Sequence, residues 1–177
     1  PQDIIPMALS HLGLDPSTKD KADYAKAGEL LAGIRPYIKT FDNYAYQRMP
    51  QKEFCVAVTW GPDGLLAMSG AAEANTGVIL DFFLPEGKGK ANLWIDGWLI
   101  PKDAENVGDA HLFLDYMMRP EVGAADSNYT WYATANLTSK PMIDKEVTSS
   151  PAAFPTSAQV NDMYTNAPLL PKVQRIQ

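Results

Sequence analysis

The sequence predicts an α/β fold, because short apolar runs typical of buried strands alternate with segments of helical periodicity. The clearest run is 54–60, "FCVAVTW", which is β-branched and aromatic and ends at a Gly-Pro pair. A segment of helical composition, 63–74, follows it, and the same order recurs at 92–101 and 107–118. Ligands of open α/β sheets bind beyond the carboxyl ends of the strands, so functional side chains are expected there.

Four segments have apolar residues at helical spacing: 3–12, 24–34, 63–74 and 107–118. Gly13 stops the first, and the second ends before Pro36. Arg119 and Pro120 terminate the fourth, and the remainder of the chain is predicted to be rich in loops.

Short apolar or aromatic runs between these helices predict four strands: 36–41, 54–60, 77–85 and 92–101. The glycine-rich turn "EGKGKA" separates the last two. Strands that alternate with helices in this order pair into a sheet on which the helices pack.

Length and charge restrict the possible functions. The 177 residues suffice for one sizeable domain or two small lobes, and 46% hydrophobic residues can form a core. Fifteen basic against 21 acidic residues give a net charge of -6, which argues against nucleic acid or an anionic membrane as partner and fits a cationic ligand. No signal peptide and no initiator Met are present, so we expect a mature or excised piece of a longer product.

Motifs for metal, cofactor or covalent chemistry are missing. Cys55 is the single cysteine, and two readings are open: a small buried hydrophobe, or a bridge to a cysteine upstream of Pro1. His11 and His111 have no second His or Cys nearby, so no metal ligation is expected. The sequence contains no GxSxG, HExxH, CxxC or phosphate-binding loop, so we expect neither a cofactor nor an enzyme.

The segment 93–101, "LWIDGWLIP", places a carboxylate where strands are depleted in Asp. At period two, Trp94, Asp96 and Trp98 share one face, so an acid lies between two indoles. Aromatic faces beside an anion attract a cationic ligand. The alternative is that Asp96 lies near a strand end and pairs with a backbone N–H or an arginine.

The same pairing of acid and ring recurs elsewhere. Trp60 ends a predicted strand, and Asp63 lies in the first turn of the next helix, where the helix dipole alone would explain an acid. Asp3 opens the first helix, and Tyr132 lies in a loop as either a core or a contact residue. Together these residues repeat the chemistry that binds a cation.

Four stretches carry a resemblance to a known family: "FCVAVTWGPDGLLA", "NLWIDGWLIPKDAENVGDAHLFLDYMMRPEV", "WYATAN" and "YTNAPLLPKVQRIQ". In this order they resemble the periplasmic polyamine-binding proteins of bacterial ABC importers, and most of all the putrescine-binding branch. The resemblance implies the type II periplasmic-binding-protein fold, which has two α/β lobes joined by crossing strands. It places 1–93 in the second lobe, 94–139 in the crossing strand and first lobe, and 140–177 back in the second lobe.

The resemblance also implies a ligand site made of acids and rings: Trp60, Asp63, Trp94, Asp96, Tyr132 and Asp3. Asp63 and Asp96 match acids that bind the ammonium groups, and the aromatic residues match the walls along the methylene chain. Asp3 stands at a position usually held by Glu, which leaves direct contact there open. An acid at Asp63 favours putrescine, because the spermidine-binding branch usually has a neutral residue there.

The expected function is therefore capture of putrescine in an inter-lobe cleft and delivery to an inner-membrane permease, in the periplasm and without chemistry. The missing N-terminal lobe of the same protein is an expected partner. Within the class, spermidine or another cationic amine is the alternative ligand. A two-carboxylate glycoside hydrolase and a sensor that kept the binding fold are the rivals from other classes.

Overall fold

A computed structural model describes residues 3–85, 87 and 89–167. Contacts divide the chain into two compact units, each assembled from segments that are discontinuous in sequence. Unit 1 comprises Pro1–Phe41, Leu84–Ile95 and Thr156–Gln177, and unit 2 comprises Asp42–Phe83 and Asp96–Pro155. These units are defined by contacts within this chain and are not the lobes predicted above. The lobe boundaries therefore remain predictions.

Unit 1 contains three α-helices and one 3-10 helix among its described residues: α1 (Ile4–His11), α2 (Lys21–Ile34), η1 (Arg35–Tyr37) and α8 (Ser157–Asp162). Helices α1 and α2 pack against each other through a buried core of Ala8, Leu9, Tyr24 and Ala27. The predicted helices at 3–12 and 24–34 are thus confirmed. The second begins earlier than expected, because the Asp20 carboxylate caps it by accepting the Ala22 N–H at 2.9 Å.

The late segment of unit 1 joins the earlier chain through backbone hydrogen bonds. A parallel bridge pairs Asn92 with Tyr164. The Leu93 N–H donates to the Tyr164 carbonyl at 2.7 Å, and the Tyr164 N–H donates to the Ala91 carbonyl at 3.0 Å. The Lys90 ammonium also donates to the Ser10 carbonyl at 2.7 Å, which ties this segment to the end of α1.

Unit 2 holds the remaining described helices: α3 (Ala45–Arg48), η2 (Met49–Gln51), α4 (Gly61–Ala74), α5 (Val107–Met117), α6 (Pro120–Thr130), η3 (Lys140–Met142) and α7 (Lys145–Thr148). Leu65 of α4 and Ala124 of α6 meet Ile143, Val147 and Ala153 in its core. Helices α4 and α5 confirm the predictions at 63–74 and 107–118.

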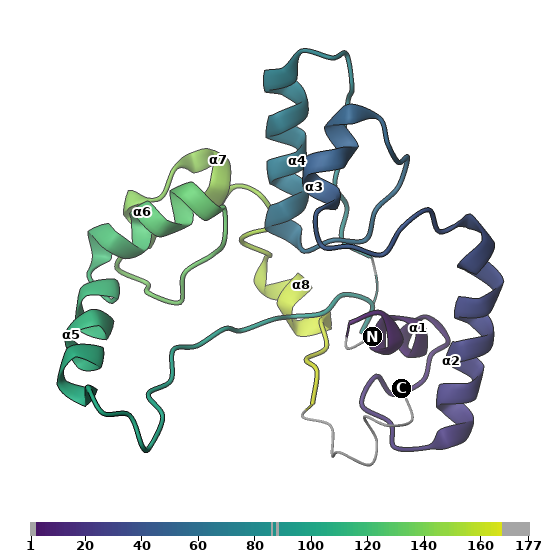
Figure 1. Cartoon of the computed structure of the whole chain (residues 1–177), viewed down its shortest axis with the longest axis horizontal. Coiled ribbons are helices and arrows are strands. Elements are labelled where there is room, and N and C mark those ends of the chain that lie inside the picture. The colour runs from purple at the N-terminus through teal and green to yellow at the C-terminus, as the bar shows by residue number, and fades with distance from the viewer. Residues whose placement is uncertain (1–2, 86, 88, 168–177) are drawn as a thin grey trace. The chain divides into compact units, whose positions relative to one another are not determined.

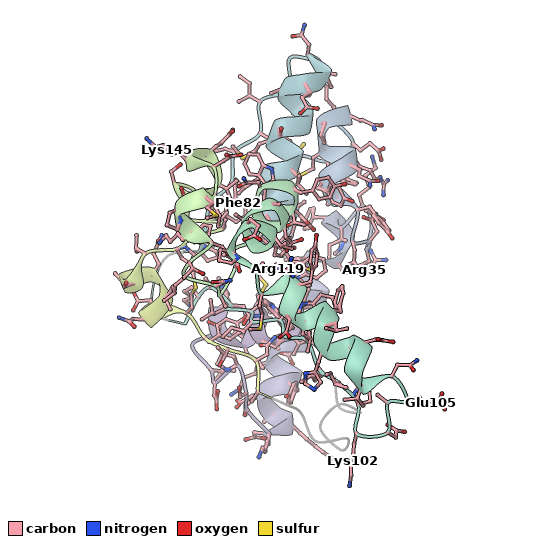
Figure 2. The ribbon with its side chains drawn as sticks, turned by 90° about the vertical axis from the view of Figure 1, so that its left-hand side faces the viewer. Arg35, Phe82, Lys102, Glu105, Arg119 and Lys145 are labelled. Atoms are coloured by element: carbon pink, nitrogen blue, oxygen red, sulfur yellow. The ribbon has the colours of Figure 1, made fainter. Side chains whose placement is uncertain are left out.

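Helices α6, α7 and α8 contradict the prediction that the chain beyond Pro120 is rich in loops. Helix α6 begins at Pro120 itself, immediately after Arg119, which lies at the junction of two helices (Figure 2). A proline that terminates one helix fits the first turn of the next, where its missing N–H is not needed. Helix α8 begins with a capping box, in which Thr156 accepts from the Gln159 N–H and the Gln159 side chain accepts from the Thr156 N–H.

The prediction of four strands is wrong for the described chain, because none of these segments forms a ladder of hydrogen bonds with a neighbour. Among the described residues no strand is assigned, and long extended segments join the helices instead (Figure 1). Segments such as 54–60 and 77–83 have an extended course without a neighbouring strand. A strand exists only through hydrogen bonds to a neighbour, so apolar composition can predict its course but not its partner.

Because these extended segments have no neighbouring strand in the described chain, several of their apolar side chains are exposed. Ile79 is 95% exposed and Leu99 is 91% exposed, although both were predicted to lie in strands of a sheet covered by helices. Cys55 is also exposed, which contradicts the reading of a buried small hydrophobe. Of the helices in the described ranges, none has the length and apolar character needed to cross a membrane.

Candidate functional site

The start of α4 positions the first acid of the site. Trp60 is the N-cap residue in an extended conformation, Pro62 lies in the first turn, and Asp63 follows it. The Gly64 N–H donates to the Trp60 carbonyl at 3.1 Å, which closes the first turn. A side chain is excluded at Gly61, because a Cβ there would lie 2.5 Å from the Ala152 carbonyl oxygen.

The end of α6 positions the aromatic partner of this acid. Trp131 adopts a left-handed conformation, with φ of 64°, which is uncommon for a residue with a side chain. Its side chain packs against the core of unit 2. The chain therefore turns sharply after α6, and the Tyr132 N–H donates to Thr130 Oγ1 at 3.3 Å.

The Asp63 carboxylate accepts hydrogen bonds from two neutral hydroxyl groups, those of Tyr132 and Thr59. Burial raises the pKa of Asp63 above its ordinary value, and the two hydrogen bonds oppose that rise. Asp63 therefore lies in the first turn of a helix, where the helix dipole favours an acid. It is also the centre of a hydrogen-bonded group. Thr59 was not predicted to belong to this site. Its position at the end of the apolar run, one residue before Trp60, was the available signal.

Tyr132 links the two predicted acids. Its pKa rises to about 12, first because it is partly buried and then because of the charge and hydrogen bond of Asp63 and the charge of Asp96. Asp96 therefore lies near enough to the phenol for its charge to act on it. The structure thus brings together Asp63, Tyr132 and Asp96, which are 33 or more residues apart in sequence, so the predicted site draws on distant parts of unit 2.

No cationic partner of either acid is found among the described residues. In the part of the chain that the structure describes, neither Asp63 nor Asp96 forms an ion pair with Lys, Arg or His. The arginine partner considered for Asp96 is therefore not observed there. Trp60 and Tyr132 are each 39% exposed, so their rings are open to a ligand. Two carboxylates, an indole and a phenol are suited to binding a cation with an apolar portion.

The other two predicted residues belong to unit 1. Trp94 is 47% exposed, and Asp3 is the N-cap residue of α1. The Asp3 side chain accepts no hydrogen bond from the helix, so it does not serve as a capping group. Trp98, which shares a predicted strand face with Trp94, packs edge-on against Phe113 of α5, with ring centroids 5.3 Å apart.

A cavity of unit 2 lies apart from this group. A cavity of about 430 Å³ opens between α3, η2 and α4, where Tyr46, Pro50 and Leu66 line it, and it contains none of the predicted site residues. In the described ranges, no three His, Cys, Asp or Glu side chains gather in a way that could hold a metal ion.

The protein-family model described as bacterial extracellular solute-binding protein matches residues 2–156, which is most of the chain.

Curated relatives match across nearly the whole chain. The putrescine-binding periplasmic protein of Escherichia coli is 32% identical over 100% of this chain and 48% of its own length. A putrescine-binding periplasmic protein of Pseudomonas aeruginosa is also 32% identical, over 99% of this chain and 47% of its own length. The chain thus spans about half the length of the curated relatives it matches. These matches confirm the resemblance to periplasmic polyamine-binding proteins.

A solved structure supports the fold. A spermidine/putrescine ABC transporter from Listeria monocytogenes superimposes with a TM-score of 0.81 at 24% identity, over 98% of this chain and 52% of that one. Together with the family match, this similarity confirms the predicted α/β class and the type II periplasmic-binding fold.

Proposed function

Because the chain belongs to the bacterial extracellular solute-binding protein family, we propose that it forms part of a periplasmic protein that captures putrescine and delivers it to an ABC permease. The binding step requires no bond to be made or broken. Lobe closure around the ligand is the expected response, and the permease receives the loaded form.

The observation that carries the proposal is the pair of acids around Tyr132. In the described ranges, the side-chain partners of the half-buried Asp63 are the neutral hydroxyl groups of Tyr132 and Thr59, and the charge of Asp96 reaches the same phenol. A carboxylate held in a partly dry site without a counter-ion is costly, and an ammonium group offsets that cost by pairing with it. A diamine supplies two such groups.

The rings suit the remainder of a diamine. Its methylene chain is apolar, and the faces of Trp60, Trp94 and Tyr132 offer both apolar contact and cation–π attraction. Acids at fixed positions also select for length, because a diamine that is too long leaves a charge without its partner. Asp3 is proposed as a further acid of the ligand shell.

The exposed extended segments support the proposal that this chain pairs with a further lobe. Ile79 and Leu99 are almost fully exposed, and apolar side chains on extended chain are typical of strands that pair in a sheet. We propose that these segments pair with strands of the further lobe that the family resemblance implies.

Spermidine is the second candidate ligand, because the spermidine/putrescine-binding periplasmic protein of Escherichia coli also matches, at 24% identity over 91% of this chain. An additional amine would need an additional anionic or polar partner. A glycoside hydrolase would also use two carboxylates, but its products would appear on incubation with a glycoside, whereas a binding protein gives none.

Calorimetric titration of the full-length protein tests the proposal. Putrescine, cadaverine, spermidine and a neutral sugar are titrated separately, and tryptophan fluorescence is recorded in parallel. We expect saturable binding of putrescine, weaker binding of the other amines and none of the sugar. Absence of binding by every amine would contradict the proposed function, and stronger binding of spermidine would move the assignment to the second candidate.

A further inference from the structure

Buried polar atoms of unit 1 that have no hydrogen-bond partner in the described structure include Asp3 Oδ1, Asn92 Oδ1 and the Tyr164 hydroxyl oxygen. Buried polar atoms are nearly always hydrogen-bonded, and each exception needs an explanation. An unpaired buried oxygen costs free energy, because it has lost water and gained nothing in exchange. Three in one unit indicate oxygens that serve something other than the fold.

The three residues are brought together by backbone pairing and by charge. Asn92 and Tyr164 face each other in the parallel bridge, and residues paired in this way project their side chains to the same side. The Asp3 charge acts on the phenol, and with burial as the larger cause it raises the pKa of Tyr164 to about 12. Residues from three distant segments therefore converge on one polar group.

The Asp3 carboxylate does not cap α1. An aspartate at an N-cap normally accepts a backbone N–H of the first helical turn, yet Asp3 makes no such bond to α1. Within the described residues it also forms no ion pair. Its charge is therefore available to a ligand, and so is the neutral phenol of Tyr164, which stays protonated at physiological pH.

The chemistry of the group identifies the class of ligand. A carboxylate, a side-chain amide carbonyl and a phenol supply three oxygen acceptors. A primary ammonium has three N–H donors and no acceptor, which matches this set. Calcium and magnesium take six or more oxygen ligands and would find half that number here. Trp94 follows Asn92 by two residues on the extended chain, so its half-exposed indole lies on the same side.

We propose that Asp3, Asn92 and Tyr164 form a subsite for a primary ammonium group in unit 1. This proposal rests on the proposed function in one respect, which is that the natural ligand is a diamine. It assigns a binding role to Asn92 and Tyr164, and it gives Asp3 direct contact with the cation.

The test uses the full-length protein and putrescine. Tyr164→Phe removes one oxygen and keeps the ring, and Asn92→Ala removes a second oxygen from a different segment. We expect each variant to bind putrescine about tenfold more weakly in calorimetry, a factor that corresponds to ~1.4 kcal/mol. Tyr37→Phe is the matched control, because Tyr37 is an exposed tyrosine of the same unit, and its affinity should not change.

Thermal unfolding without amine separates a binding role from a structural one. An oxygen that has no partner in the fold destabilises the free protein, so Tyr164→Phe should leave its melting temperature unchanged or raise it while affinity falls. Unchanged affinity in both variants would overturn the subsite. A parallel loss of affinity and melting temperature would also overturn it, since the hydroxyl would then serve the fold, for example through a water.

Failure of the proposed function has a different signature. If the unsubstituted protein binds no putrescine, the function assigned above is wrong, and propylammonium chloride then probes the subsite alone. A rise in melting temperature with propylammonium that Tyr164→Phe abolishes would support the subsite. Equal rises in both proteins, or none, would overturn it.

Discussion

Replacing Asp63 with Asn tests the acid with the most defined surroundings. The substitution removes the charge and keeps the size of a side chain that accepts hydrogen bonds from Tyr132 and Thr59. An ammonium at about 4 Å from a carboxylate gains about 4 kcal/mol at an effective dielectric constant near 20. Desolvation and ordering offset part of this, so we expect a net loss of ~2–3 kcal/mol, or about 30- to 150-fold in the dissociation constant for putrescine.

The same substitution should affect stability in the opposite direction. The folded state raises the pKa of Asp63, so this carboxyl contributes stability below its ordinary pKa and loses that contribution as the pH rises through the raised value. At neutral pH the ionised group therefore weakens the free protein. Asp63→Asn should have a higher melting temperature than the parent at pH 7 and a smaller difference near pH 3.

The assay is calorimetric titration with putrescine and thermal unfolding at the two pH values, both on the full-length protein. Asp109→Asn is the matched control, because Asp109 is an exposed acid in the first turn of α5 and shares only the helix-dipole role. An Asp63→Asn affinity within about twofold of the parent, the range of experimental scatter in such titrations, would refute the reasoning about charge. A lower melting temperature at pH 7 would refute the reasoning about burial.

Three further predictions concern neighbouring features. Tyr132→Phe removes a hydrogen bond that lowers the pKa of Asp63, so NMR titration should find that pKa higher than in the parent, and an unchanged value would contradict the bond. Gly61→Ala forces a Cβ against the Ala152 carbonyl and should lower the free energy of unfolding by about 1–3 kcal/mol in urea titration, whereas a neutral effect would mean that the backbone relaxes. Thr156→Ala removes the capping box of α8 and should cost about 1 kcal/mol by the same measurement, with Thr165→Ala, at an exposed threonine of the same unit outside any helix, as control.

The helices were predictable because their signals are local. Helices α1, α2, α4 and α5 each show apolar spacing within a single segment, and nearby Gly or Pro residues mark where several of them end. Helix α8 also had a local signal, because a Thr three residues before a Gln is a capping-box pattern that was not used. Helix α6 was missed because Pro120 was read only as a terminator.

The strands could not be predicted as paired elements, because pairing depends on residues far away in the chain or outside it. The run at 54–60 has the composition of a strand and an extended course, yet no ladder forms along it in the described chain. Composition reports what a side chain prefers to contact, and the contact itself is a property of the tertiary structure.

The sequence predicted some residues of the candidate site but not their contacts, because contacts also depend on residues far away in the chain. The sequence indicated the residue types and their order, so Asp63, Asp96 and Tyr132 could be singled out as candidates before any geometry was known. It could not indicate that Thr59 donates to Asp63, or that the buried Tyr164 hydroxyl has no partner among the described residues. Both facts depend on which segments the fold brings together, and their roles in ligand binding remain predictions.

The discontinuous make-up of unit 1 has a consequence for the order of events during synthesis. Its bridge joins Asn92 to Tyr164, and about 70 residues separate them in the chain. At ~5–20 residues per second, a ribosome needs about 4 to 14 s to bridge that interval. Throughout that time the nascent segment around Asn92 and Trp94 has no C-terminal partner, so its exposed apolar neighbours are open to chaperones and to proteases. The segment that carries Tyr164 must therefore be synthesised before the bridge of unit 1 can form.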